Sequence, residues 1–182
     1  MINLPICLFV QTHSSYHRII SLKLVFNVFR SFLTSGLSFL NIGSGTGYFS
    51  CMAGCILQAH GINHGIEFYP NLVQFAKERV EEFLRFSPSV ADDICPPTFL
   101  AGNCFRLDPS GCHYDRVYCG AACPASKVPF ILSLTKIGGF AVIPCRDKVR
   151  FSFIFLTTCL VVGLLMSLTG NLLQVFRYQV AY

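Results

Sequence analysis

The sequence predicts an α/β fold in which a parallel β-sheet is covered by helices on both faces. Short apolar runs alternate with longer amphipathic segments through the middle of the chain, which is typical of such sheets. A glycine cluster, Gly43-Ser44-Gly45-Thr46-Gly47, separates the first apolar run from the helix expected after it. Of the 182 residues 53% are hydrophobic and only 13% are charged. This excludes a disordered chain, because disorder needs low hydrophobicity and high charge.

The elements follow one another along the chain. A polar stripe at helical spacing predicts a first helix over 16–33, and further helices are expected over 48–58, from Pro70 onward, and over 126–136. Apolar runs predict five strands, at 38–42, 63–68, 98–101, 114–119 and 140–144. The segment 87–97 is rich in Pro and Asp and predicts a loop, and Gly138-Gly139 predicts a turn. The helix from Pro70 has a predicted buried face made of Leu72, Val73, Ala76, Val80, Phe83 and Leu84.

The last part of the chain has a different amino-acid composition. Residues 151–176 contain no Asp, Glu, Lys, Arg or His, and Arg150 and Arg177 flank them. One interpretation is a helix that crosses a bilayer, since the segment is long enough. A second is a buried strand and helix that complete the sheet, with a turn at Gly170-Asn171. A third is an altered end of the gene product.

Charge and cysteine content exclude two classes of function. The net charge of +5 includes no Lys/Arg-rich run of the kind that nucleic-acid binding needs, so no nucleic-acid partner is expected. The ten cysteines include Cys51-x3-Cys55 and Cys119-x3-Cys123 but no paired C-x2-C knuckles. We therefore expect no metal site, and free thiols in a reducing cytoplasm.

The glycine cluster is the strongest candidate for a binding site. Glycines let the backbone approach a ligand closely, and the start of a helix offers free N–H donors. A dinucleotide fingerprint would need its third glycine at position 48, where this sequence has Tyr48 and places Gly47 one residue early. This spacing disfavours NAD and favours S-adenosyl-L-methionine.

Two later positions extend the candidate site. Glu67 ends the second predicted strand, about 20 residues after the glycines, where a carboxylate can accept hydrogen bonds from both ribose hydroxyls. The alternative for Glu67 is an ordinary solvated acid. Asn103 and Cys104 follow the third predicted strand, and Asn103 can bond an adenine edge or serve only as a turn residue after Gly102.

Five segments together resemble one known family. FLNIGSGTGYFS, GINHGIEFYP, AGNC, YDRVYCGAA and KIGGFAVIP, in this order, resemble the protein-L-isoaspartate O-methyltransferase family. The likeness is strongest to its domain-containing proteins, which have an Asn, here Asn41, where the repair enzyme has an acid. The resemblance covers about 38–146. It implies a Rossmann-like class I S-adenosyl-L-methionine-dependent methyltransferase sheet, incomplete at its C-terminal end. It also implies cofactor contacts from Gly43, Ser44, Gly45, Glu67 and Asn103. The candidate cofactor-binding set further includes their neighbours Thr46, Gly47 and Cys104.

The resemblance further implies an activity and a domain plan. The expected activity is protein repair, in which isoaspartyl (D-aspartyl) carboxylates of damaged proteins or peptides are methylated in the cytoplasm. An ionised carboxylate needs positioning and exclusion of water rather than a general base, so no catalytic residue is assigned. The expected plan is a divergent N-terminal helical segment (1–37), a cofactor-binding domain (38–149) and a hydrophobic tail (150–182).

Two departures from the family keep alternatives open. Residues 1–37 contain no counterpart of the Thr-Ile-Ser-Ala-Pro-His type of segment that precedes the glycine loop in the repair enzymes. Asn103 stands where the repair enzyme has an Asp. One alternative is a catalytically inactive binding or adaptor module that recognises modified proteins. Another is a tail-anchored protein that contacts a membrane through 151–176.

Overall fold

The computed structural model describes residues 30–121, 123–145, 148–154, 160–166 and 172–179. The chain divides into two compact units, Met1–Cys104 and Phe105–Tyr182. Most of the helix predicted over 16–33 lies outside the described residues. Its described end is a short 3₁₀ helix, η2 (Arg30–Phe32).

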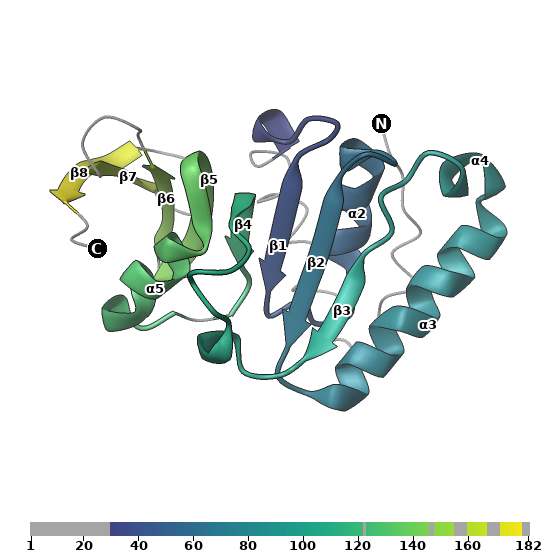
Figure 1. Ribbon diagram of the computed structural model, residues 1–182. Helices are drawn as coiled ribbons and strands as arrows, with labels where there is room; N and C mark the ends of the chain where they lie inside the picture. The colour runs from purple at the N-terminus through teal and green to yellow at the C-terminus, as the bar shows by residue number, and fades with distance from the viewer. Residues whose placement is uncertain (1–29, 122, 146–147, 155–159, 167–171, 180–182) are drawn as a thin grey trace. The chain divides into compact units, whose positions relative to one another are not determined.

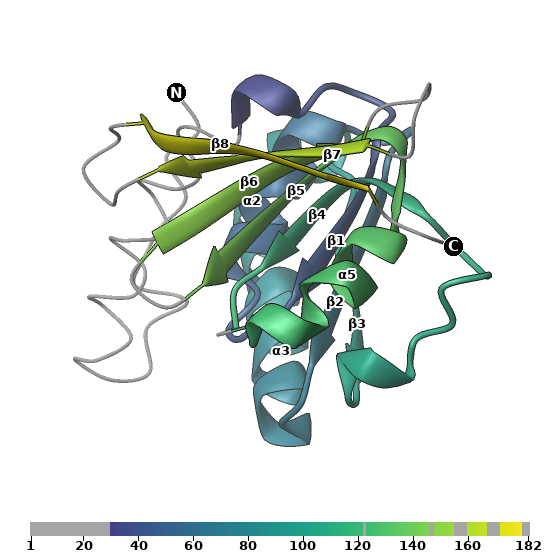
Figure 2. The same ribbon diagram turned by 90° about the vertical axis from the view of Figure 1, so that its left-hand side faces the viewer.

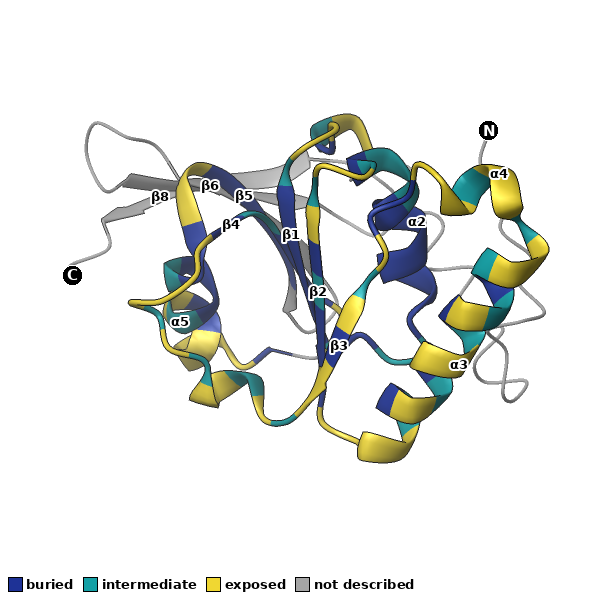
Figure 3. Cartoon of the chain, turned by 45° about the vertical axis from the view of Figure 1, so that its right-hand side comes forward, coloured by how far each residue is buried: buried dark blue, intermediate teal, exposed yellow. Residues whose placement is uncertain are grey.

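The first unit contains three parallel strands, β1 (Ser38–Ile42), β2 (Ile62–Glu67) and β3 (Thr98–Ala101). β2 lies between the other two and pairs with both (Figure 1). Every residue of β1 is buried, which Figure 3 shows as a continuous dark blue strand. All three strands were predicted, with bounds within one residue, because each is a short apolar run between glycine or polar segments.

Two helices pack on one face of this three-stranded sheet. They are α2 (Tyr48–Leu57), which starts directly after the glycine cluster, and α3 (Pro70–Phe86). The predicted inner face of α3 is confirmed at Val73, Ala76, Val80 and Phe83, which are buried. Leu72 and Leu84 were also expected there but are only half-buried, at the edge of the apolar stripe.

The segment between α3 and β3 differs from the predicted loop. Its first part forms a short helix, α4 (Pro88–Ala91), with proline at the first helical position. The prediction was wrong for these residues because a proline there favours a helix start, since its fixed φ suits the helix and its missing N–H would have no helical partner. The end of the segment is held against α2, where the Cys95 N–H donates to the Gly54 carbonyl at 3.0 Å.

The second unit begins with one parallel pair. β4 (Tyr114–Cys119) and β5 (Thr135–Cys145) are parallel, and η4 (Ala125–Lys127) and α5 (Val128–Ser133) connect them. A short 3₁₀ helix, η3 (Cys104–Arg106), follows β3. The helix predicted over 126–136 is therefore shorter than expected, because residues from Thr135 onward already belong to a strand.

The predicted turn at Gly138-Gly139 lies inside β5 instead. Tyr114 pairs with Thr135, but Arg116 pairs with Phe140, so β5 carries extra residues at this point. Gly138 has a φ of +80°, and a Cβ on Gly139 would lie 2.7 Å from the Lys136 carbonyl oxygen. The glycines therefore form an irregularity within a strand, a role that glycine also takes in β-bulges.

The hydrophobic tail is made of strands where it is described. β6 (Lys148–Ile154), β7 (Leu160–Met166) and β8 (Leu172–Gln179) follow β5 in antiparallel pairs (Figure 2). Among the described residues no helix has the length and apolar character to cross a membrane. The interpretations that placed a helix in 151–176 were wrong for the described parts, since an apolar run alone does not separate strand from helix. The proposed turn at Gly170-Asn171 lies outside the described residues.

Candidate functional site

The glycine loop, Gly43–Gly47, joins β1 to α2 and turns back onto β2. The N–H groups of Gly43 and Ser44 both donate to the Ile66 carbonyl, at 2.8 and 3.1 Å. Gly45 has a φ of +55°, a left-handed conformation that favours glycine. A Cβ built on Gly45 would meet nothing within 4 Å, so open space lies over the middle of the loop.

Glu67 connects the glycine loop to the end of β2. One carboxylate oxygen, Oε2, accepts a hydrogen bond from the Gly45 N–H at 2.9 Å. The other, Oε1, accepts one from the N–H of Tyr69, the residue that precedes α3, at 3.2 Å. The side chain is 7% exposed, so the alternative of a solvated acid is wrong. Each oxygen has a second lone pair, which lets the carboxylate accept further donors.

The predicted site residues lie at the carboxyl ends of three neighbouring parallel strands. The loop follows β1, Glu67 ends β2, and Asn103 and Cys104 follow β3. The Gly102 N–H donates to the Glu67 carbonyl at 2.8 Å, so the segment after β3 is joined to the end of β2. Carboxyl ends of strands in open α/β sheets are where ligands bind. Asn103 is exposed, and Thr46 and Cys104 are half-buried.

A buried polar layer between the sheet and α2 was not predicted as part of the site. Asn41 Nδ2 donates to Ser50 Oγ at 2.9 Å, and Asn63 Nδ2 donates to the Ser50 carbonyl at 2.9 Å and to the Cys95 carbonyl at 3.0 Å. All of these side chains are at least nine-tenths buried. The signal in the sequence was an asparagine within each of two apolar strands, since a buried amide requires hydrogen-bond partners.

Three buried oxygens in this region have no hydrogen-bond partner within the described part of the chain. They are Oδ1 of Asn41, Oδ1 of Asn63 and Oγ of Ser44. Leaving a buried acceptor or hydroxyl unpaired costs about 1–3 kcal/mol. Ser44 belongs to the glycine loop itself, so its hydroxyl has spare hydrogen-bonding capacity at the candidate site.

Burial suppresses the acidity of three side chains of α2. It raises the pKa of Tyr48 to about 12 and that of Cys55 to about 11, and it raises the pKa of Cys51 further still. A thiol must lose its proton to act as a nucleophile or a metal ligand. Cys51 and Cys55 therefore pack as small apolar groups.

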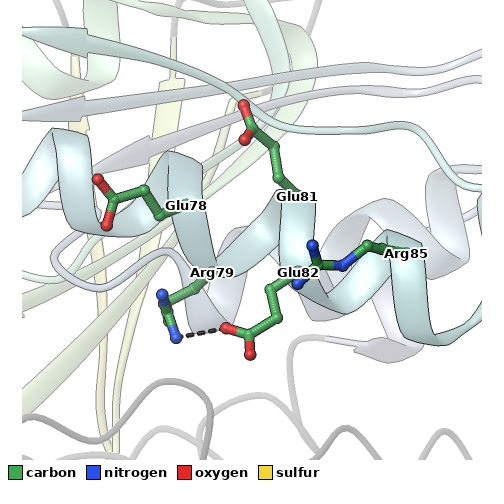
Figure 4. A pocket seen from close by; sticks show the side chains of 5 residues that line it. All are labelled: Glu78, Arg79, Glu81, Glu82 and Arg85. Atoms are coloured by element: carbon green, nitrogen blue, oxygen red, sulfur yellow. Dashed lines mark ion pairs between the residues drawn. The ribbon is translucent and has the colours of Figure 1, made fainter.

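A charged pocket lies on α3 (Figure 4). Arg79 forms an ion pair with Glu82 there. The pocket is lined by Glu78, Arg79, Glu81, Glu82 and Arg85. The pocket contains none of the predicted site residues.

Solved structures with the same architecture define the class of fold. A protein-L-isoaspartate O-methyltransferase is 20% identical with a TM-score of 0.62, and the match covers 88% of this chain and 46% of that one. A Plasmodium falciparum chain in complex with S-adenosyl-L-homocysteine is 21% identical with a TM-score of 0.62, over 83% of this chain and 69% of that one. The fold is therefore the Rossmann-like α/β fold of S-adenosyl-L-methionine-dependent methyltransferases.

Sequence comparison then establishes the family. The family model "Protein-L-isoaspartate(D-aspartate) O-methyltransferase (PCMT)" matches residues 5–156, and the chain belongs to this family. A Triticum aestivum protein-L-isoaspartate O-methyltransferase is 32% identical over 118 residues, which are 63% of this chain and 48% of the relative. One from Hyperthermus butylicus is 30% identical over 123 residues, 64% of this chain and 47% of the relative. The chain thus spans about half the length of these curated relatives.

The predicted resemblance is confirmed, and the match is wider than expected. The resemblance was assigned to about 38–146, whereas the family match begins at residue 5 and ends at residue 156. The sequence segment before the glycine loop is therefore related to the family, although it lacks the motif expected there.

Proposed function

We propose that this chain binds S-adenosyl-L-methionine at the glycine loop and Glu67, and that it methylates isoaspartyl carboxylates of damaged proteins. The observation that carries the proposal is the hydrogen bond from the Gly45 N–H to the buried Glu67 carboxylate, beside open space at Gly45. Membership of the protein-L-isoaspartate O-methyltransferase family supports the choice of cofactor and substrate.

The residues present fit such a cofactor. The open space at Gly45 admits a ligand close to the backbone. Each oxygen of the Glu67 carboxylate already accepts one backbone N–H, from Gly45 or from Tyr69. Its remaining lone pairs can accept hydrogen bonds from the two ribose hydroxyls. In this proposal Gly43, Thr46 and Gly47 line the same ligand, and Asn103 and Cys104 border its adenine.

The proposed chemistry requires little from the side chains. When bound, the cofactor supplies a sulfonium methyl group, to which a substrate carboxylate oxygen forms a bond while the carbon–sulfur bond breaks and its electron pair stays on sulfur. The substrate carboxylate has a pKa of about 3.9 and is ionised at neutral pH, so no residue has to remove a proton. The chain's own part is to bind, to orient and to exclude water.

The proposal is tested by one binding and one transfer measurement on the full chain. Calorimetry with S-adenosyl-L-homocysteine reports binding, and methyl-labelled S-adenosyl-L-methionine reports transfer to an isoaspartyl peptide. The same peptide with a normal aspartyl residue is the control. Binding together with transfer to the isoaspartyl peptide alone supports the proposal, and no binding overturns it.

A second candidate function is a binding module without catalysis. It is favoured by Asn103, a neutral residue where the repair enzyme has an acid, and by the neutral, buried Asn41 in the strand before the loop. Cofactor binding without methyl transfer would support this alternative over the enzyme.

We also propose a domain organisation and a cellular location for the chain. We propose residues 38–149 as the cofactor-binding domain, between the segments 1–37 and 150–182, with isoaspartyl proteins or peptides as partners. The proposed location is the cytoplasm, because seven of the eight cysteines among the described residues are free thiols. Free thiols are typical of reducing compartments.

A further inference from the structure

A single aromatic ring lies beneath the glycine loop. Phe99 is the second residue of β3, and its side chain is only 5% exposed. It pairs in register with Gly65 of β2, which in turn pairs with Asn41 of β1. The ring thus lies on the face of the sheet that carries α2 and α3.

Two glycines make room for this ring. A Cβ on Gly65 would lie 2.6 Å from Cδ1 and 2.9 Å from Cε1 of Phe99. A Cβ on Gly47 would lie 2.8 Å from Cζ of the same ring and 3.1 Å from Cβ of Ala76 in α3. Real Cβ contacts are essentially never shorter than 3.0 Å, so one edge of the ring occupies the space that a side chain would need at either glycine.

The contacts connect the two halves of the proposed cofactor site. Gly47 is the last residue of the glycine loop, and Gly65 lies two residues before Glu67 on β2. The ring edge therefore touches the loop that carries the Gly45 N–H and the strand that carries the Glu67 carboxylate. The 2.9 Å bond between those groups depends on how closely the loop lies on β2.

We infer that Phe99 is a positioning residue for the proposed cofactor site, because its ring sets where the glycine loop lies relative to β2. The inference rests on the proposed function and adds to it a residue outside the predicted cofactor contacts. Groups that position a ligand must be held within fractions of an ångström, so a gap beneath the loop weakens binding.

The first test compares two matched substitutions. Phe99→Leu removes the ring atoms that face Gly47, and Phe83→Leu makes the same chemical change at a 3% exposed position of α3. Affinity for S-adenosyl-L-homocysteine is measured by calorimetry at a temperature where circular dichroism shows both variants folded. We expect Phe99→Leu to weaken binding about tenfold, which corresponds to about 1.4 kcal/mol, and Phe83→Leu to leave it unchanged.

The second test is a double-mutant cycle. Gly65→Ala alone should weaken binding, because its methyl group would lie 2.6 Å from Cδ1 of the ring and 3.0 Å from Cβ of Ser44. Phe99→Val removes the closer of these two contacts, so the double variant should lose less affinity than the product of the two single losses. A general loss of core packing would not produce this rescue.

The outcomes separate the inference from the proposed function. If the wild-type chain does not bind S-adenosyl-L-homocysteine, both are overturned. If the wild type binds and Phe99→Leu binds equally well, or Phe83→Leu loses as much, only the role of Phe99 is overturned. The role of Phe99 is also overturned if the double variant loses affinity by the full product of the two single losses, since the ring would then not act through Gly65.

Discussion

Glu67 is expected to stabilise the fold even without a ligand, and Glu67→Gln tests this. The carboxylate accepts the Gly45 N–H at 2.9 Å and the Tyr69 N–H at 3.2 Å, and it is almost fully buried. Glutamine has one acceptor oxygen, and its NH2 group would face the other N–H. The substitution therefore leaves one backbone donor unpaired and replaces one charge-assisted bond by a neutral one.

The size of the effect follows from these two bonds. A hydrogen bond to a charged group contributes about 1.5–3 kcal/mol, and an unpaired buried donor costs about 1–3 kcal/mol. Removing a buried charge offsets part of this loss. We expect the free energy of unfolding of the ligand-free protein to fall by about 2 kcal/mol, measured by urea denaturation.

The control is Glu81→Gln on α3, where the carboxylate is exposed. Its free energy of unfolding should change by less than about 0.5 kcal/mol. If Glu67→Gln changes stability no more than this control, the carboxylate does not hold the loop to the start of α3, and the reasoning fails.

Three further predictions concern packing, pH and thiol reactivity. Gly54→Ala should lower stability by about 2 kcal/mol in urea denaturation, because its Cβ would lie 2.3 Å from the Cys95 carbonyl oxygen. A Cβ on Gly102 would meet nothing within 4 Å, so Gly102→Ala should change the free energy of unfolding by less than about 0.5 kcal/mol. Equal losses of stability in the two variants would contradict the packing argument. Burial raises the pKa of Cys51 above its ordinary 9.0, so the folded chain keeps a proton that the unfolded chain releases. This contribution to stability is fully present below about pH 9 and declines as pH rises, by up to about 1.4 kcal/mol per pH unit. In the Cys51→Ala variant, the free energy of unfolding measured in urea should fall less between about pH 8 and pH 10 than in the wild type. An equal fall in both proteins would contradict the raised pKa of Cys51. Exposed Cys112 should react with iodoacetamide faster than buried Cys51 when labelled peptides are followed by mass spectrometry, and equal rates would show that Cys51 is accessible.

The local elements of the first unit could be predicted because each has its own signal. Strands β1, β2 and β3 are apolar runs of strand length, and α3 shows apolar residues at helical spacing. The tail could not be predicted in the same way. Residues 151–176 contain no charged residue that would mark solvent-facing positions at a period of 2 or 3.6, so the length of the apolar segment suggested a membrane helix.

The candidate site was predicted in part for a similar reason. The glycine loop and Glu67 are polar or flexible residues at the ends of apolar strands, so they are visible in a sequence. Phe99 looks like any other apolar strand residue, and only the register of β2 and β3 shows that it faces Gly65. Gly138-Gly139 was misassigned because a glycine pair also suits an irregular strand.

The central claim is that the glycine loop binds S-adenosyl-L-methionine, and one pair of variants tests it most directly. Gly45 and Gly36 both have positive φ, +55° and +83°, and a Cβ on either would meet nothing within 4 Å. Valine therefore introduces similar backbone strain at both, but only Gly45 lies in the loop. Calorimetry with S-adenosyl-L-homocysteine should show binding by the wild type and by Gly36→Val, and none by Gly45→Val. Equal affinity for all three would contradict the assignment of the site.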